Sequence, residues 1–352
     1  MLACSTRRLS SRWFSSSCVR WHENPLGLPR SGGPNPPPQM PRRTGPIQKK
    51  PIPNVKRVVA VASGKGGVGK STVAVNLAFA LSTLRPPGST ARLRVGVLDL
   101  DIFGPSIPTL MGLQNAEEPL LTSGGALIPL INHGIPTMSM GFLLPRSPDS
   151  NSTNDSPVVW RGLMVQKAVQ QLLFDVDWRN QQGLGLDILV VDMPPGTGDV
   201  PLTLGQLVVV DGQSQIISEI KDNDALKGAV IVSTPQDVAL ADVSKGIAML
   251  RKIAVPITGI VLNQSHFLCP GCETRHYLYG SPEAFQATAA RLGVDVLAEL
   301  PLVPGVSQGG DGGLPYGLMS STQHGDKDGP GGSEWLKDMK RVAEHVWQSI
   351  AK

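Results

Sequence analysis

Six short runs of apolar residues divide the middle of the chain. Each run is rich in β-branched residues and shows no alternation with polar positions, which is typical of strands buried on both faces of a parallel sheet. A segment of helical periodicity, residues 72–84, follows the first run, and helix-compatible stretches separate the others. The predicted strands cover residues 58–62, 95–98, 188–191, 229–232, 257–262 and 294–297.

This alternation of strands and helices predicts an α/β fold, with a mostly parallel central sheet flanked by helices. Such folds bind ligands at the carboxyl ends of the strands. We expect a single domain over residues 55–303. Residues 304–333 are rich in glycine and predict a long loop, whereas Trp335, Met339, Val342 and Val346 recur at helical spacing and predict a C-terminal helix over residues 334–352.

Positive charge is concentrated at the N-terminus, where residues 1–50 hold nine lysines and arginines and one acid, Glu23. The first 22 residues combine arginines, serines and scattered apolar residues without any acid, which is typical of a mitochondrial transit peptide. We place this peptide at residues 1–24 and expect the protein in the mitochondrial matrix; a disordered basic tail is the alternative. Residues 25–54 are rich in proline and predict an extended linker.

The rest of the chain has 23 basic and 27 acidic residues. A mildly acidic body argues against a nucleic-acid partner, which would require basic charge on the folded domain. No apolar run approaches the roughly 18 residues of a membrane-spanning helix, so we expect no integral membrane segment. Four cysteines are too few for a disulfide framework.

A phosphate-binding motif follows the first predicted strand directly. Residues 64–71 read G-K-G-G-V-G-K-S and satisfy G-x-x-x-x-G-K-[ST] between a strand and a helix. The glycines let backbone N–H groups point at phosphate oxygens, and the helix adds its positive dipole end. Lys70 would reach the β- and γ-phosphates and Ser71 would ligate Mg²⁺. The predicted nucleotide-binding residues here are Gly64, Lys65, Gly66, Gly67, Val68, Gly69, Lys70, Ser71 and Thr72.

Acidic residues end the next two strands of the predicted core. Asp99 and Asp101 follow the second strand, and Asp192 ends the third. Carboxylates at these positions face the phosphate loop, so we expect Asp99 and Asp192 to hold Mg²⁺ with Ser71, and Asp101 to orient the attacking water. Asn263 follows a later strand and is the predicted reader of the base. A guanine-specific N-K-x-D would place an aspartate where the chain has His266, so adenine, and hence ATP, is favoured.

Two cysteines lie close together outside the N-terminal segment. Cys269 and Cys272 are spaced C-P-G-C, and two thiolates at this spacing can bind one metal ion or one edge of an iron–sulfur cluster. A [4Fe-4S] cluster needs four ligands, which two chains together supply, so this interpretation predicts a homodimer. His266 and His276 flank the pair and make a zinc site within one chain possible by ligand count. A redox disulfide is a further alternative.

Several of these motifs together resemble a known family. The loop G-K-G-G-V-G-K-S-T is similar to the deviant Walker A of the MinD/Mrp class of dimeric ATPases, which implies that Lys65 crosses to the partner's nucleotide. A solvent-exposed lysine is the alternative. The chain resembles the Mrp/ApbC family of iron–sulfur P-loop ATPases, in its mitochondrial branch associated with complex I assembly, over roughly residues 52–303. The shared segments are residues 101–106, 159–162, 190–199, 233–237 and 269–272.

The resemblance implies an ATP-dependent scaffold or carrier that holds a labile [4Fe-4S] cluster across a homodimer. The recipients would be mitochondrial apo-proteins, complex I subunits first, and slow ATP hydrolysis would serve transfer. It favours a cluster over zinc at the cysteine pair and makes both histidines polar loop residues. The alternatives are a MinD/ParA-like positioning ATPase and a P-loop ATPase with structural zinc. Residues 213–228 depart from the family pattern and indicate a possible insertion.

Overall fold

The computed structural model describes residues 50–102, 104–143, 162–196, 226–319 and 321–351. The predicted transit peptide, nearly all of the predicted linker, and residues 213–225 of the possible insertion lie outside the described residues. Residues 47–352 belong to one compact unit. None of the described helices is both long enough and apolar enough to cross a bilayer.

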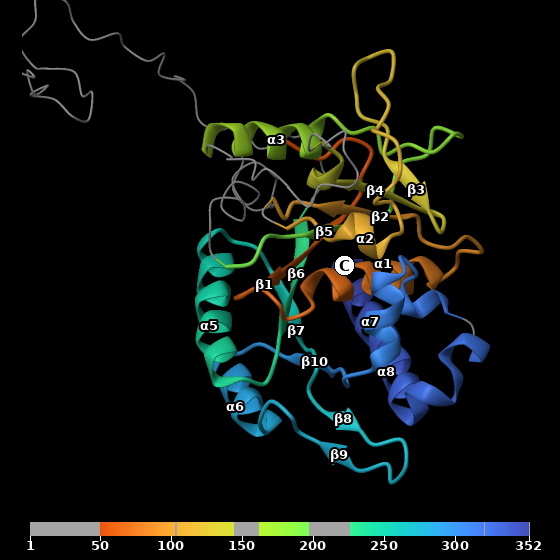
Figure 1. Ribbon diagram of the computed structural model, residues 1–352. Coiled ribbons are helices and arrows are strands. Elements are labelled where there is room, and N and C mark those ends of the chain that lie inside the picture. The colour runs from red at the N-terminus through yellow and green to blue at the C-terminus, as the bar shows by residue number, and fades with distance from the viewer. Residues whose placement is uncertain (1–49, 103, 144–161, 197–225, 320, 352) are drawn as a thin grey trace, which may run out of the picture. The chain divides into compact units, whose positions relative to one another are not determined.

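An eight-stranded sheet forms the centre of this unit (Figure 1). Its order is β10-β7-β6-β1-β5-β2-β4-β3, and all neighbours pair in parallel except β3, which runs antiparallel to β4 at one edge. The strands are β1 (Val58–Ser63), β2 (Val95–Asp99), β3 (Leu130–Asn132), β4 (Ile135–Ser139), β5 (Ile188–Asp192), β6 (Leu226–Ser233), β7 (Ile257–Leu262) and β10 (Val296–Glu299).

The strand predictions are confirmed for all six apolar runs. Every residue of β2 and β5 is buried, because helices cover both faces of the sheet. The last predicted strand begins two residues late, at Val296, since Val294 still closes the preceding helix by donating its N–H to the Ala289 carbonyl. β3 and β4 were not predicted: Gly134 and Pro136 interrupt the apolar pattern there.

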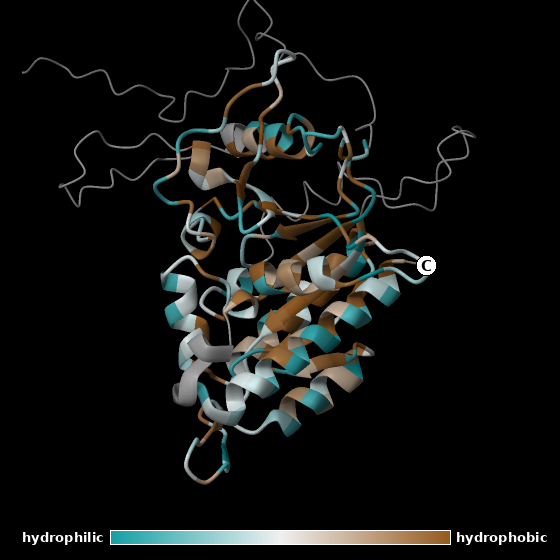
Figure 2. Cartoon of the chain, turned by 90° about the vertical axis from the view of Figure 1, so that its right-hand side faces the viewer, coloured by the Kyte–Doolittle hydropathy of each residue, from teal (hydrophilic) through white to brown (hydrophobic). Residues whose placement is uncertain are grey.

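Helices form a layer on each face of the sheet, and its apolar strands lie between them (Figures 1 and 2). One layer contains α5 and α6; the other contains α1, α7 and α8, with α8 packed along α1. The predicted helix over residues 72–84 is confirmed as α1. The helical bounds are α1 (Lys70–Thr83), α2 (Ile107–Leu110), η1 (Met140–Leu143), α3 (Gly162–Phe174), α5 (Asp237–Lys252), α6 (Pro282–Leu292), α7 (Pro304–Asp311), η2 (Tyr316–Leu318) and α8 (Ser321–Ile350).

The glycine-rich segment is largely helical, so the prediction of a loop over residues 304–333 was wrong. α7, η2 and the first part of α8 occupy it. Its glycines serve close packing: a Cβ on Gly309 would lie 2.7 Å from the Leu314 carbonyl oxygen, and one on Gly332 would collide with the Tyr316 hydroxyl. Tyr316 is fully buried and meets Trp335 edge to face at 5.2 Å. Small residues here let α7, η2 and α8 approach each other.

A small hairpin carries the cysteine pair. β8 (Phe267–Leu268) and β9 (Arg275–His276) are antiparallel and separate from the main sheet. The turn between them contains Cys269 and Cys272, and Glu273 adopts a left-handed conformation with φ of 55°. α8 lies beside this hairpin, where Arg275 forms an ion pair with Glu334 at 2.7 Å.

Candidate nucleotide and metal sites

Three neighbouring parallel strands end at the same edge of the sheet and define the first candidate site. β1, β5 and β2 are adjacent, and Asp192 is in register with Val61 on one side and with Asp99 on the other. This places the end of β1, where the glycine loop begins, beside the two carboxylates. The predicted convergence of loop and acids is therefore a consequence of strand order.

The loop between β1 and α1 has the backbone that phosphate binding requires. Gly67 and Gly69 both have φ of 78°, a conformation that side chains disfavour. A Cβ on Gly66 or Gly67 would meet nothing within 4 Å, so the loop is open there, whereas one on Gly64 would lie 2.5 Å from the Asp242 backbone. A pocket of about 260 Å³ lies over it, lined by Ser63, Lys65, Gly66, Gly67, Gly69, Lys70, Ser71, Thr72, Asp101, Gly104, Ser106, Leu110 and Pro195.

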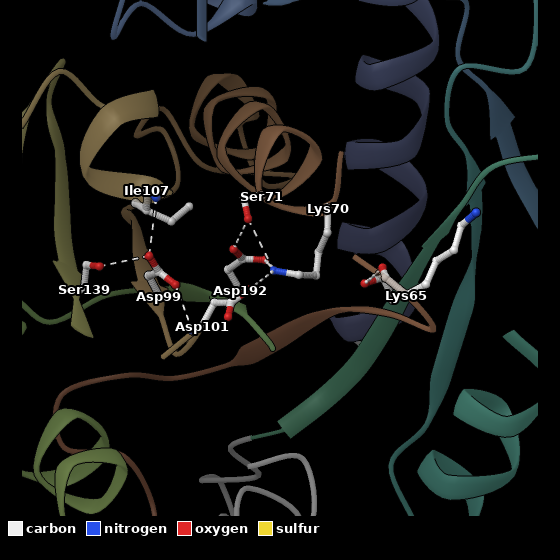
Figure 3. A network of polar contacts seen from close by, with 9 residues as sticks. Lys65, Lys70, Ser71, Asp99, Asp101, Ile107, Ser139 and Asp192 are labelled. Carbon is white, nitrogen blue, oxygen red and sulfur yellow. Dashed lines mark hydrogen bonds and ion pairs between the residues drawn. The ribbon is translucent and has the colours of Figure 1, made fainter. Parts of the chain in front are cut away.

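Lys70, Ser71 and Asp192 contact one another under this loop (Figure 3). The Lys70 ammonium donates to Asp192 Oδ1 at 2.6 Å, and the Ser71 hydroxyl donates to Asp192 Oδ2 at 2.5 Å. Asp101 Oδ2 lies 3.7 Å from Lys70 Nζ. Burial raises the pKa of Asp192, and the contacts with Lys70 and Ser71 oppose that shift. A hydroxyl and two carboxylates that meet in this way are hard oxygen donors, which fit Mg²⁺.

Asp99 makes hydrogen bonds of its own beside Asp192, and its contact with Mg²⁺ stays a prediction. Its carboxylate accepts hydrogen bonds from the Ser139 hydroxyl at 2.9 Å and from the Asp101 N–H at 2.9 Å, and it points toward the N–H of Ile107 (Figure 3). Asp99 is fully buried, and burial together with the nearby Asp192 raises its pKa to about 8. The structure thus turns Asp99 away from Ser71 and makes it a support for the backbone that carries Asp101. No sequence pattern predicted the contact of Ser139 with Asp99.

Lys65 points away from the phosphate-facing side of its own loop (Figure 3). Its ammonium donates to Gln236 Oε1 at 2.5 Å, at the residue that precedes α5. The side chain is only partly buried. The Lys65 ammonium is therefore held at the start of α5, and its contact with a partner's nucleotide stays a prediction.

Asn263 lies against the phosphate loop. Its side-chain amide donates to the Val68 carbonyl at 2.8 Å, and its backbone N–H donates to the Ser233 carbonyl at 2.7 Å. A Cβ on Gly69 would collide with this amide, so the contact also requires glycine there. Asn263 stabilises the loop, and its contact with a base stays a prediction.

The second candidate site lies on the hairpin. The Sγ atoms of Cys269 and Cys272 and a ring nitrogen of His276 all lie within 4.8 Å of one another. Cys272 is exposed, and hydrogen bonds from Thr274 lower its pKa to about 7, which favours the thiolate. His266 does not join them: it is buried, and its Nδ1 contacts the Ser265 hydroxyl at 2.7 Å. In the sequence, His266 and His276 were equally possible ligands. The register of the hairpin places His276, and not His266, beside the cysteines.

A glycine loop between β1 and α1, with a lysine, a serine and acidic residues at adjacent strand ends, defines a P-loop NTPase. Residues 54–328 match the family described as ParA: NUBPL iron-transfer P-loop NTPase. With most of its length matched, the chain belongs to this family.

Named relatives agree with that assignment. The chain is 44% identical over 269 residues to the iron-sulfur cluster transfer protein NUBPL of Dictyostelium discoideum, covering 76% of this chain and 72% of that protein. It is 43% identical over 266 residues to the iron-sulfur protein required for NADH dehydrogenase, mitochondrial, of Arabidopsis thaliana, covering 76% of this chain and 73% of the relative.

Solved structures agree with the fold. A nucleotide-binding protein from Archaeoglobus fulgidus, in complex with ADP and with cobalt found in it, superposes with a TM-score of 0.53 at 33% identity, covering 74% of this chain and 87% of that chain. The cell division ATPase MinD of Pyrococcus furiosus gives a TM-score of 0.51 at 18% identity, covering 83% and 99%, and shows a shared fold.

Proposed function

We propose that this protein is an ATP-dependent iron–sulfur cluster carrier of mitochondria, whose cargo is a labile [4Fe-4S] cluster. The observation that carries the proposal is the convergence of Cys269 and Cys272 on an exposed hairpin, in a chain whose relatives are named as iron–sulfur transfer proteins. Soft thiolates select iron–sulfur clusters and thiophilic ions over hard cations.

The cysteine count supports a homodimer. A cubane cluster takes four thiolates, and the hairpin of one chain offers two. The side chains of Tyr277 and Leu278, directly after β9, are exposed at 44% and 60%. Apolar groups this open beside the cysteines favour a second copy of the hairpin as their cover, related by a two-fold axis through the cluster.

Nucleotide chemistry is assigned to the phosphate loop. Lys70 would hold the β- and γ-phosphates of ATP, while Ser71 and Asp192 would supply oxygen ligands for Mg²⁺. Bound Mg²⁺ neutralises charge that develops on the transferring phosphate. Asp101 orients the attacking water, and Lys65 reaches the nucleotide of the partner chain. The expected hydrolysis is slow and serves to change the dimer geometry that holds the cluster.

Two independent features support delivery inside mitochondria. The N-terminal segment has the composition of a transit peptide, and a plant relative is named as required for mitochondrial NADH dehydrogenase. We therefore propose the matrix as the location and apo-proteins of complex I as the first recipients.

Anaerobic reconstitution of a chain that starts near residue 45 tests the proposal. About four iron and four sulfide per dimer are expected. Cys269→Ala and Cys272→Ala should each lose the cluster and keep ATP binding, because the hairpin is separate from the phosphate loop. Cluster retained in both variants would refute the carrier assignment. Tightly bound zinc without sulfide would indicate the structural-zinc alternative.

A further inference from the structure

His276 shares a face of the cysteine hairpin with Cys269. In the antiparallel register Phe267 pairs with His276 and Leu268 with Arg275, and the Cys269 N–H donates to the Thr274 carbonyl, two residues beyond the first pair. Paired residues of an antiparallel ladder share a face, and so do residues two apart on one strand. Cys269 and His276 are therefore diagonal neighbours on the same face, at a separation that side chains bridge.

The turn brings the third donor to the same place. Glu273 donates its N–H to the Cys269 carbonyl at 2.9 Å, and its positive φ reverses the chain after Cys272. All three donor atoms then lie within 4.8 Å of one another. Two thiolates bound tetrahedrally to one zinc-sized ion, at about 2.3 Å each, are about 3.8 Å apart, so the donors need to approach one another by at most about 1 Å to surround a single ion.

The same register excludes the other histidine. His266 precedes Phe267 and faces the opposite side, where its side chain is 1% exposed and its Nε2 lies 3.5 Å from Glu334. His276 is exposed, as is Cys272, so the side of the site opposite the hairpin is open to solvent. Two thiolates and one imidazole with an open fourth position match the donor set of four-coordinate sites for divalent ions of intermediate softness.

We propose that Cys269, Cys272 and His276 form a site within one chain that binds a single divalent transition-metal ion, such as Fe²⁺, Zn²⁺ or Co²⁺, separately from the cluster shared by two chains. The inference rests on the proposed function only through the two thiolates that both sites use. A shared [4Fe-4S] cluster needs the four cysteines alone, so His276 distinguishes the single-ion site from it.

Cobalt titration of the metal-free full chain tests this proposal, with the visible spectrum as the readout. One Co²⁺ per chain is expected, with the strong bands of tetrahedral coordination and a thiolate-to-cobalt charge-transfer band. His276→Ala should bind at least about tenfold more weakly and lose the tetrahedral bands, since loss of even an outer-shell partner costs about 10- to 100-fold. His276→Cys should restore them. His345→Ala, an exposed histidine on α8, is the matched control.

Wild-type affinity and spectrum in His276→Ala would overturn the inference, as would the absence of tetrahedral cobalt in the wild type. ATP binding verifies that each variant is folded. Reconstitution of the cluster separates the two proposals: His276→Ala should keep about four iron and four sulfide per dimer. If His276→Ala lost both the cluster and the bound cobalt, the proposal of a separate single-ion site would be overturned. A cluster that persists in Cys269→Ala and Cys272→Ala refutes the carrier function, whatever the cobalt result.

Discussion

In the proposed function Lys65 acts on the nucleotide of the partner chain, so its loss should affect hydrolysis and leave ATP binding intact. Its ammonium contacts Gln236 and not the acids around Lys70. Lys65→Ala should therefore bind ATP with nearly unchanged affinity and hydrolyse it at least about a thousandfold more slowly, because a charge delivered by a partner acts on the transition state. Equilibrium ATP binding and single-turnover hydrolysis measure the two quantities. Lys245→Ala, which removes an exposed lysine paired with Asp242, is the control and should change neither. Weakened binding with normal turnover of bound ATP would contradict the assignment.

Asp99 should make stability depend on pH in the opposite sense to most carboxylates. Its folded pKa of about 8 lies above the ordinary value of 3.8, so between these values the folded state holds a proton that the unfolded state has lost. The contribution is full below pH 3.8 and is lost as the pH rises through about 8. The associated slope is up to about 1.4 kcal/mol per pH unit.

Asp99→Asn removes this titrating carboxyl group and should make the free energy of unfolding less dependent on pH. Urea unfolding of the nucleotide-free protein between about pH 5 and pH 8 measures it. Asp192 contributes a slope of the same sign in both proteins, since burial raises its pKa as well. The exposed Asp175→Asn serves as the comparison and should follow the wild type. An equally steep loss of stability in Asp99→Asn would show that Asp99 is ionised when folded.

Among the elements, α7 and α5 offer a matched pair of helical glycines. A Cβ on Gly309 of α7 would lie 2.7 Å from the Leu314 carbonyl oxygen, while one on Gly246 of α5 would meet nothing within 4 Å. Gly309→Ala should lower the free energy of unfolding by about 1–3 kcal/mol through overpacking. Gly246→Ala should raise it by about 0.5–1 kcal/mol through helix propensity. Denaturant unfolding compares them, and equal effects would show that the segment around α7 is not closely packed.

The same elements show how far sequence patterns can predict this structure. Strands such as β2 and β5 are buried on both faces, so continuous apolar runs identify them without knowledge of the fold. The phosphate loop is equally local, since its geometry depends on consecutive residues. The helices of the glycine-rich segment were missed because their glycines reflect contacts with residues elsewhere in the chain, such as Tyr316 with Gly332. His276 could not be distinguished from His266 in the sequence, because its place beside the cysteines depends on the register of the hairpin.

At the scale of the whole molecule, α8 connects the two candidate sites. It packs along α1, the helix that begins with Lys70, and across β6, β7 and β10. Glu334 of the same helix pairs with Arg275 of the cysteine hairpin at 2.7 Å. A rearrangement of the phosphate loop that moves α1 would therefore reach the hairpin through one continuous helix. In the proposed function, α8 would thus connect the state of the nucleotide with the binding of the cluster.

The proposed dimer predicts that two variants, each inactive alone, recover ATP hydrolysis when their chains are mixed. A Lys65→Ala chain keeps its own Asp101, and an Asp101→Asn chain keeps its own Lys65. If Lys65 acts on the partner's nucleotide, each variant alone should be inactive, whereas a mixed dimer contains one complete site. After free exchange of equal amounts, half of the dimers are mixed, so the mixture should recover about one quarter of the wild-type hydrolysis rate.

Recovery requires that the complete site be assembled from two chains, since neither variant holds both residues. Single-turnover ATP hydrolysis before and after exchange measures it, and the oligomer mass confirms that dimers are present. Combining both substitutions in one chain and mixing it with Asp101→Asn is the matched control: Asp101 is then absent from every site, so no complete site forms. Activity in Lys65→Ala alone, or none in the mixture, would mean that Lys65 does not act across the dimer and would leave its contact with Gln236 as its only assigned role.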